Sequence, residues 1–393
     1  MEATEDSTAA APSGSSSGSS CAQCGASTSK TCAGCRSANE FLQGADKTYY
    51  CSKECQQAHW TTHKATCERA RRHQTMYQGG DLLQALWTVL RTETFPTTID
   101  RVEVDGDTIT FWETCNGTAP PFPHHLFQDD KVKQAVLDYG ACSDALFHMR
   151  KLVQELFSAI SSETTEVNYR VKERRLSVKC YNRHRGRSEY AIVGSQFWFV
   201  TGGSPAGGDF SDERVFSHSV FVTALKGDGE GFVIDLASRQ YGHSDNIIPV
   251  NKYLAERVSN VISKNPFGTH DETIGSVDEQ NSMYFERVQF GALRMHRLLR
   301  TWLAENNLTL SGLVALDKAS FQTKLAVLRE YATRGLQATA KESAECCALF
   351  PRLLKAKDPN EKARIAQQRL DILEASGITV DLMQPENRSW FGC

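Results

Sequence analysis

The segment Cys51-Ser-Lys-Glu-Cys55-Gln-Gln-Ala-His-Trp-Thr-Thr-His63-Lys-Ala-Thr-Cys67 carries two pairs of metal-ligating side chains. Cys51 lies four residues before Cys55, and His63 lies four residues before Cys67. The segment lacks Gly and Pro and can be helical, and residues four apart share one face of a helix. Two Cys-x2-Cys units precede it, at Cys21 and Cys24 and at Cys32 and Cys35. Eight potential ligands therefore come in four pairs.

The spacing of these pairs predicts two metal sites. Zinc takes four ligands in a tetrahedron, and a Cys-x2-Cys turn delivers two thiolates to one ion. The pairs that begin at Cys51 and His63 start twelve residues apart, which on an unbroken helix is about 18 Å. One ion cannot span that distance, so each pair needs a Cys-x2-Cys unit from upstream. Spacing does not decide which unit joins which pair.

The first residues of the chain favour zinc over disulfide bonds. Residues 1–20 are Ser/Gly-rich and acidic, with no basic start followed by an apolar run of the kind that directs secretion. We expect this tail to be disordered. Disulfide bonds need an oxidising compartment, so we expect an intracellular protein, in the nucleus or the cytoplasm, whose clustered cysteines bind zinc.

Residues 21–67 resemble a MYND-type zinc finger. The resemblance is carried by Tyr49-Tyr50-Cys51-Ser52, Cys55-Gln56, His59-Trp60, His63 and Cys67. In that family the two sites interleave. The resemblance therefore implies one zinc ion on Cys21, Cys24, Cys51 and Cys55, and a second on Cys32, Cys35, His63 and Cys67.

The resemblance also implies that the zinc ions are structural and that the finger takes part in protein–protein interaction. Two complete sets of four protein ligands leave no open position for catalysis. MYND fingers often bind short proline-containing peptides, and Trp60 and Gln56 are the candidates for the recognition surface. His59 also lies four residues from Cys55, but we expect it to be a surface or packing residue.

The rest of the chain predicts an α+β domain over residues 80–265. Apolar residues recur at helical spacing in residues 81–91 and 134–160. Arg101–Trp112 reads as a β-hairpin around Asp105-Gly106. A second hairpin is expected across residues 216–236, and its turn falls in the Gly-rich stretch 226–231. The expected fold class is thus α+β with antiparallel hairpins.

A helical region is expected after this domain. From residue 278 to residue 373 the apolar pattern is almost wholly helical. We assign residues 278–393 to this region, which makes the predicted order a disordered tail, a two-zinc finger, an α+β domain and a helical region.

Three residues of the α+β domain suggest a second kind of chemistry. Cys142 begins an amphipathic helix, His218 lies on a predicted strand and Asp235 on the next. This order resembles that of papain-like and transglutaminase-like folds, which implies a thiol-dependent amide-processing enzyme such as a peptidase, a deamidase or a transglutaminase. A helix N-terminus lowers the pKa of a thiol, His218 would be the base and Asp235 would orient it.

The same three residues also have an ordinary structural explanation, because free cysteine is among the most buried residue types. The hairpin register leaves the choice open. A turn centred on Asp228-Gly229 sets Asp235 opposite Val222, four residues from His218. A turn nearer 226–227, or a bulge, sets Asp235 level with His218.

Charge and hydropathy exclude several other classes. The net charge is −3, so we expect no general field for nucleic acid, and the basic run Arg69–His73 reads as a solvated helix face. No stretch of eighteen apolar residues occurs, so we expect no membrane span. The sequence therefore predicts a zinc-binding interaction protein with a regulatory role, and a thiol-dependent enzyme is the alternative.

Overall fold

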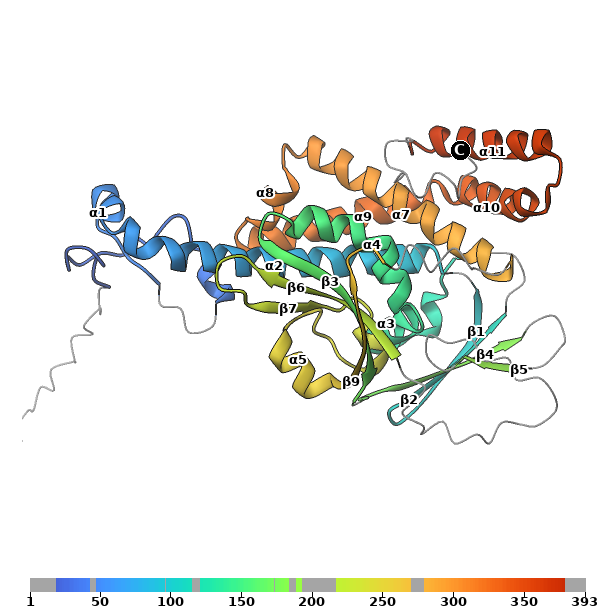
Figure 1. The fold of residues 1–393 in the computed structure, drawn as a ribbon, viewed down its shortest axis with the longest axis horizontal. Coiled ribbons are helices and arrows are strands. Elements are labelled where there is room, and N and C mark those ends of the chain that lie inside the picture. The colour runs from blue at the N-terminus through green and yellow to red at the C-terminus, as the bar shows by residue number, and fades with distance from the viewer. Residues whose placement is uncertain are drawn as a thin grey trace, which may run out of the picture. The chain divides into compact units, whose positions relative to one another are not determined.

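The structure is a computed structural model of the 393-residue chain. It divides into two compact units, Met1–Gln74 and Thr75–Cys393. Figure 1 shows the order of the elements along the chain. The structure describes residues 19–42, 47–95, 97–114, 121–172, 174–183, 189–192, 217–269 and 279–378. Most of the predicted disordered tail and the last part of the predicted helical region lie outside the described residues.

The first unit is built from short elements. It contains the 3-10 helix η1 (Ala38–Phe41), helix α1 (Lys53–Ala58) and the beginning of helix α2 (Trp60–Glu93). The Ser52 hydroxyl caps α1 by accepting a hydrogen bond from the Cys55 backbone N–H at 3.2 Å. Residues 51–67 are thus helical as expected but are not one unbroken helix, because His59 separates α1 from α2.

The second unit contains two sheets. The smaller has the strand order β1 (Thr98–Asp105), β2 (Thr108–Thr114), β4 (Ser177–Arg183) and β5 (Glu189–Ile192). Its first hairpin turns at Gly106, whose φ of 54° suits glycine, as the Asp105-Gly106 signal predicted. Strands β2 and β4 are parallel, and the other two pairs are antiparallel.

The larger sheet is antiparallel throughout. Its strand order is β8 (Ile247–Pro249), β7 (Gly231–Ile234), β6 (Ser217–Leu225), β3 (Ser161–Val171) and β9 (Val258–Pro266). Strands β6 and β7 form the second predicted hairpin. Mixed helix and antiparallel sheet confirm the α+β class.

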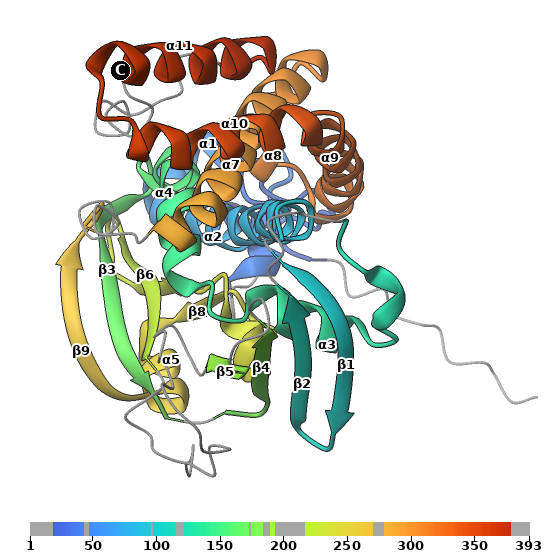
Figure 2. The same ribbon diagram turned by 90° about the vertical axis from the view of Figure 1, so that its right-hand side faces the viewer.

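Helices surround the two sheets of this unit. Those within the α+β region are α3 (Asp130–Asp138), α4 (Cys142–Phe157) and α5 (Val250–Arg257), with the 3-10 helices η2 (His124–Leu126) and η4 (Ser238–Tyr241). The predicted helical region contains α7 (Glu279–Glu305), α8 (Leu310–Val314), α9 (Lys318–Gln337), α10 (Ala340–Lys355) and α11 (Pro359–Ala375). In Figure 2 helices α7, α9 and α10 lie on one side of this unit and the strands on the other.

One large hydrophobic core joins these layers. It contains buried residues of α2, α4, β6, β7, α7 and α9, including Trp87 and Trp302. The α+β and helical regions therefore share a core, and α4 is held directly against β6. A second core lies between the smaller sheet and α3. This packing fixes the N-terminus of α4 near the beginning of β6.

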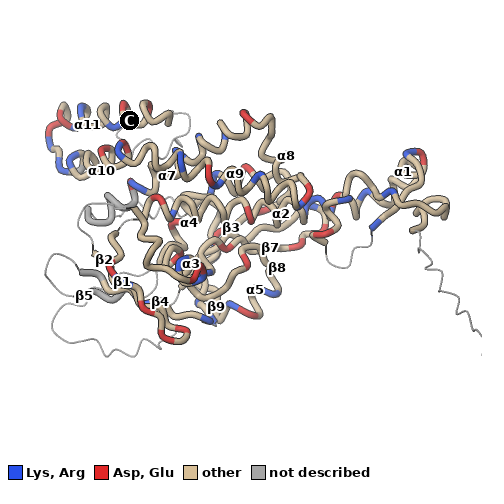
Figure 3. The backbone as a smooth tube through the Cα atoms, turned by 180° about the vertical axis from the view of Figure 1, so that it is seen from behind, with Lys and Arg blue, Asp and Glu red and all other residues tan. Residues whose placement is uncertain are grey.

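The helices that the structure describes were compared for charge and for apolar length. In Figure 3 basic and acidic residues are interspersed along α10 and α11. Among the described residues, every helix is too short or too polar to cross a membrane.

Candidate metal centres and a buried polar cluster

The first candidate metal centre joins residues from two distant parts of the finger. Cys21, Cys24, Cys51 and Cys55 bring their sulfur atoms within 4.8 Å of one another. The Sγ of Cys24 lies 3.5 Å from that of Cys51 and 3.8 Å from that of Cys55. Zinc–sulfur bonds of about 2.3 Å in a tetrahedron require sulfur–sulfur distances of about 3.8 Å. The four thiolates therefore fit one zinc ion.

The second candidate centre is fully buried. It consists of Cys32, Cys35, His63 and Cys67, whose ligand atoms also lie within 4.8 Å of one another. The Cys35 Sγ is 3.4 Å from the His63 Nε2. Burial lowers the pKa of His63, which favours the neutral imidazole that a metal requires. The two sites interleave, so the pairing implied by the MYND resemblance is the one that the structure forms.

Residues around the second centre orient its ligands. The Gln56 side-chain amide donates a hydrogen bond to the Cys32 Sγ at 3.3 Å. The Tyr50 hydroxyl lies 2.9 Å from the His59 Nδ1, and the Tyr50 ring meets the His63 ring edge-on. His59 is thus a packing residue, as expected. Gln56 supports a ligand, a role the sequence did not indicate, and Trp60 remains 39% exposed.

Comparison with known proteins agrees with this geometry. The family model for the MYND zinc finger of ZMYND11/ZMYD8 matches residues 32–67. That range holds six of the eight ligands, and Cys21 and Cys24 complete the first centre from outside it. No curated protein and no solved structure matches the chain.

Family match and geometry together define a class for the N-terminal unit. It contains a zinc finger of the MYND type with places for two structural zinc ions. Fingers of this type mediate protein–protein interaction. No comparison supports the resemblance of the second unit to papain-like or transglutaminase-like folds, which therefore depends on its residues alone.

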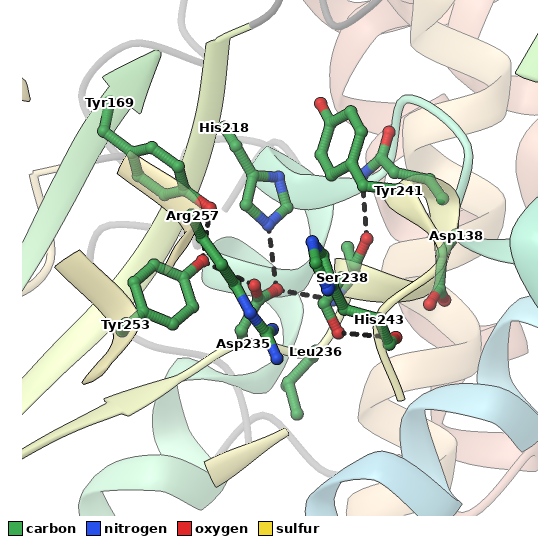
Figure 4. Close-up of polar contacts among 12 residues, drawn as sticks. Asp138, Tyr169, His218, Asp235, Leu236, Ser238, Tyr241, His243, Tyr253 and Arg257 are labelled. Atoms are coloured by element: carbon green, nitrogen blue, oxygen red, sulfur yellow. Dashed lines mark hydrogen bonds and ion pairs between the residues drawn. The ribbon is translucent and has the colours of Figure 1, made fainter. Parts of the chain in front are cut away.

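The three residues singled out in the second unit lie in one buried cluster. Cys142 is the first residue of α4, His218 is on β6, and Asp235 directly follows β7. The His218 Nε2 lies 2.8 Å from the Asp235 Oδ1 (Figure 4). Cys142, His218 and Asp235 are 2%, 0% and 1% exposed.

The register of the β6–β7 hairpin differs from both registers that the sequence allows, with Asp235 opposite Val222 or level with His218. Val222 pairs with Val233 and Phe221 with Ile234, so the register continued by one residue would set Asp235 level with Val220. His218 and Val220 share a face of β6. The imidazole therefore reaches the carboxylate diagonally, without the level pairing that a turn at 226–227 would have produced.

Interactions between the side chains of the cluster shift the pKa values of His218 and Cys142 against the direction that burial alone would give. Burial alone would lower the pKa of His218, but the charge and hydrogen bond of Asp235 and the nearby Cys142 raise it to about 10. Burial would raise the pKa of Cys142, yet interaction with His218 and the Ser219 backbone lowers it. The cluster thus favours a thiolate, an imidazolium and a carboxylate.

The two ring nitrogens of His218 have different surroundings. Nε2 faces Asp235, whereas Nδ1 is buried and has no hydrogen-bond partner of ordinary geometry among the described residues. The rings of Tyr169 and Tyr241 meet the imidazole edge-on at centroid distances of 5.5 and 5.1 Å. These rings fix the plane of the imidazole and leave Nδ1 as the atom available to Cys142.

Gln240 connects the segments that carry Cys142 and Asp235. Its Oε1 accepts a hydrogen bond from the Gly140 N–H at 3.2 Å, and its Nε2 donates to the Ala237 carbonyl at 2.9 Å. The Ala237 N–H in turn donates to the Asp235 Oδ1 at 3.2 Å. Nothing in the sequence pattern had indicated this connection.

Proposed function

We propose that this protein is a regulatory interaction protein of the nucleus or cytoplasm, whose MYND finger binds short proline-containing segments of partner proteins. The observation that carries the proposal is the completeness of both zinc sites. Four protein ligands at each ion leave no open coordination position, so the metal stabilises a surface. The exposed indole of Trp60 offers that surface an aromatic face, the kind of group that receives proline rings.

A displayed peptide library tests this proposal on the intact, zinc-loaded protein. We expect the recovered peptides to be enriched in proline, and Trp60→Ala to weaken their binding by about tenfold or more. Gln57→Ala, a substitution of an exposed residue on α1, is the matched control. Both variants should retain two zinc ions. Recovery of peptides without proline, or equal binding by both variants, would contradict the proposal.

A second candidate function is thiol-dependent amide chemistry in the second unit. It is supported by the contact of His218 with Asp235 and by the lowered pKa of Cys142 beside them. In this proposal the Cys142 thiolate attacks an amide carbonyl carbon, the C–N bond breaks, and His218 gives its proton to the leaving amine. Water or a second amine then attacks the acyl carbon and gives a proton to His218, and the C–S bond breaks to restore the Cys142 thiolate. Because the three side chains are buried, the site must open to admit an amide.

Alkylation by iodoacetamide across pH, with the modified residues mapped, tests the second candidate. We expect Cys142 to react below the ordinary thiol pKa of about 8.5, and this reaction to be lost in His218→Ala. The zinc-bound cysteines should be protected. If Cys142 reacts only as an ordinary thiol does, the candidate enzyme is excluded and the second unit is a scaffold.

A further inference from the structure

Two tyrosine hydroxyls extend the buried cluster beyond Asp235. Tyr253 on α5 donates a hydrogen bond from its hydroxyl to the Asp235 Oδ2 at 2.6 Å. The Tyr169 hydroxyl on β3 makes a hydrogen bond with the Tyr253 hydroxyl. Both side chains are almost fully buried, and Figure 4 shows Tyr253 beside Asp235 and below Tyr169.

The direction of these hydrogen bonds follows from the number of protons. A tyrosine hydroxyl carries one proton, and that of Tyr253 is donated to the carboxylate. Tyr169 must therefore donate to the Tyr253 oxygen. The chain of donors runs from Tyr169 through Tyr253 to Oδ2, while the Ala237 N–H and His218 Nε2 contact Oδ1. Each carboxylate oxygen is thus held by its own hydrogen-bond partners.

We propose that Tyr253, with Tyr169 behind it, is a positioning residue that holds Asp235 charged and turned toward His218. This inference rests on the second proposed function, in which His218 serves Cys142. Packing supports it, because the Tyr169 ring also meets the His218 ring edge-on at 90°. Tyr169 therefore contacts the imidazole with its ring, while its hydroxyl reaches the carboxylate only through Tyr253.

Several charged or titratable groups face Asp235 from the surrounding elements. Arg257 on α5 stacks its guanidinium over the Tyr253 ring at 5.2 Å and lowers the pKa of Asp235. The charge of Asp235 helps to raise the pKa of Asp138 on α3, although burial of Asp138 is the larger cause. Within the described ranges, the groups that interact electrostatically with Asp235 are His218, Tyr169, Tyr241, Tyr253, Arg257 and Asp138. Cys142 interacts with His218.

Tyr253→Phe tests the proposal, because it removes one hydroxyl and keeps the ring beneath Arg257. The buried Oδ2 then lacks a charge-assisted donor and takes up a proton at higher pH. A neutral Asp235 no longer stabilises the imidazolium. We expect the acid limb of the Cys142 alkylation profile to move up by about one pH unit. Tyr77→Phe, at a partly buried tyrosine of α2, should leave the profile unchanged.

A second readout is the low-field ¹H NMR signal of the proton between His218 Nε2 and Asp235 Oδ1, assigned by its loss in His218→Ala. We expect Tyr253→Phe to shift this signal, Tyr169→Phe to shift it less, and Tyr77→Phe to leave it in place. Tyr169→Phe retains the bond from Tyr253 to Asp235, so it also serves if Tyr253→Phe does not fold.

The two readouts separate the inference from the function on which it rests. An unreactive Cys142 with a shifted proton signal excludes the thiol function and supports the positioning by Tyr253. A reactive Cys142 whose profile and proton signal are the same in Tyr253→Phe and Tyr77→Phe overturns the positioning and leaves the thiol function intact. Loss of thermal stability without either shift also overturns it, since that is the effect of packing alone.

Discussion

Buried cysteines in this protein differ in what surrounds the sulfur atom. Cys346 lies in a helical layer where burial raises its pKa to about 11, so its thiol stays protonated. Cys142 is equally buried, but the adjacent His218 lowers its pKa. The cysteines of the finger lie in two sets whose ligand atoms are close enough to hold a metal ion. The same residue type therefore packs in a core, has a lowered pKa or is placed to bind metal, according to its immediate neighbours.

The zinc ligands lead to a prediction at single-residue scale. Cys55→Ser removes one thiolate from the first centre, so we expect the metal content to fall from two zinc ions per chain to about one. His59→Ala is the control, because His59 contacts Tyr50 and lies outside both ligand sets. Metal analysis of the purified proteins measures this. Two zinc ions in Cys55→Ser would show that the first centre is assigned wrongly.

The contact between His218 and Asp235 predicts a pH dependence of stability. The folded pKa of His218, about 10, exceeds its ordinary value of 6.5. The contribution of this contact to the free energy of unfolding is therefore complete below pH 6.5 and is lost as the pH rises through about 10. Breaking a buried pair costs about 3–5 kcal/mol, so Asp235→Asn should lower the free energy of unfolding by about that amount near pH 6.

Urea denaturation at several pH values measures this effect. The difference between the native protein and Asp235→Asn should shrink from pH 6.5 toward pH 10. Asp105→Asn, in the exposed β1–β2 turn, should show no such trend. A difference that grows with pH would mean that His218 is neutral in the folded protein.

At the scale of elements, two glycines let helix α2 pack closely on its neighbours. A Cβ atom on Gly80 would lie 2.1 Å from the Ile247 Cγ1, and one on Gly79 would lie 2.7 Å from the Phe157 ring. Glycine is unfavourable within a helix by about 1 kcal/mol relative to alanine. The helix accepts this cost because β8 and α4 approach its backbone.

Gly80→Ala should therefore destabilise the protein although alanine favours helix. Overpacking of a core costs about 1–3 kcal/mol, which exceeds the gain in helix propensity. Urea denaturation of Gly80→Ala, Ile247→Ala and the double variant measures the free energy of unfolding of each. The double variant should lose less than the sum of the single losses, because the shorter side chain removes the clash. Simple additivity would contradict the close approach.

At the scale of the whole molecule, the chain forms two units that are stabilised differently. In the finger, Cys21, Cys32, Cys35 and Cys67 are four of the eight residues in the buried cluster, so the metal takes the place of a core. The second unit has a large core of leucine, valine and aromatic residues. We therefore expect its stability to depend on apolar burial.

Removal of zinc should therefore affect one unit alone. With excess chelator we expect the heat of unfolding of the finger to disappear from the calorimetric scan. The main unfolding transition, that of the second unit, should keep its midpoint temperature. Cys55→Ser without chelator should reproduce part of this change, which excludes a direct effect of the chelator. A large fall in the midpoint of the main transition would show that the second unit needs the metal.

The sequence by itself determined the local features of this protein. Ligand spacing predicted two zinc sites, and the turn at Asp105-Gly106, the α+β class and the C-terminal helices followed from patterns a few residues long. Such patterns suffice because thiolate pairs, turns and amphipathic helices depend on near neighbours.

Only the tertiary structure decided how distant segments meet. The register that sets His218 diagonally to Asp235 came from a Gly-rich turn that several geometries satisfy. The support of that pair by Tyr253, Tyr169 and Gln240 has no signal in the sequence, because these residues come from α5, β3 and η4 and only the packing of those elements brings them together.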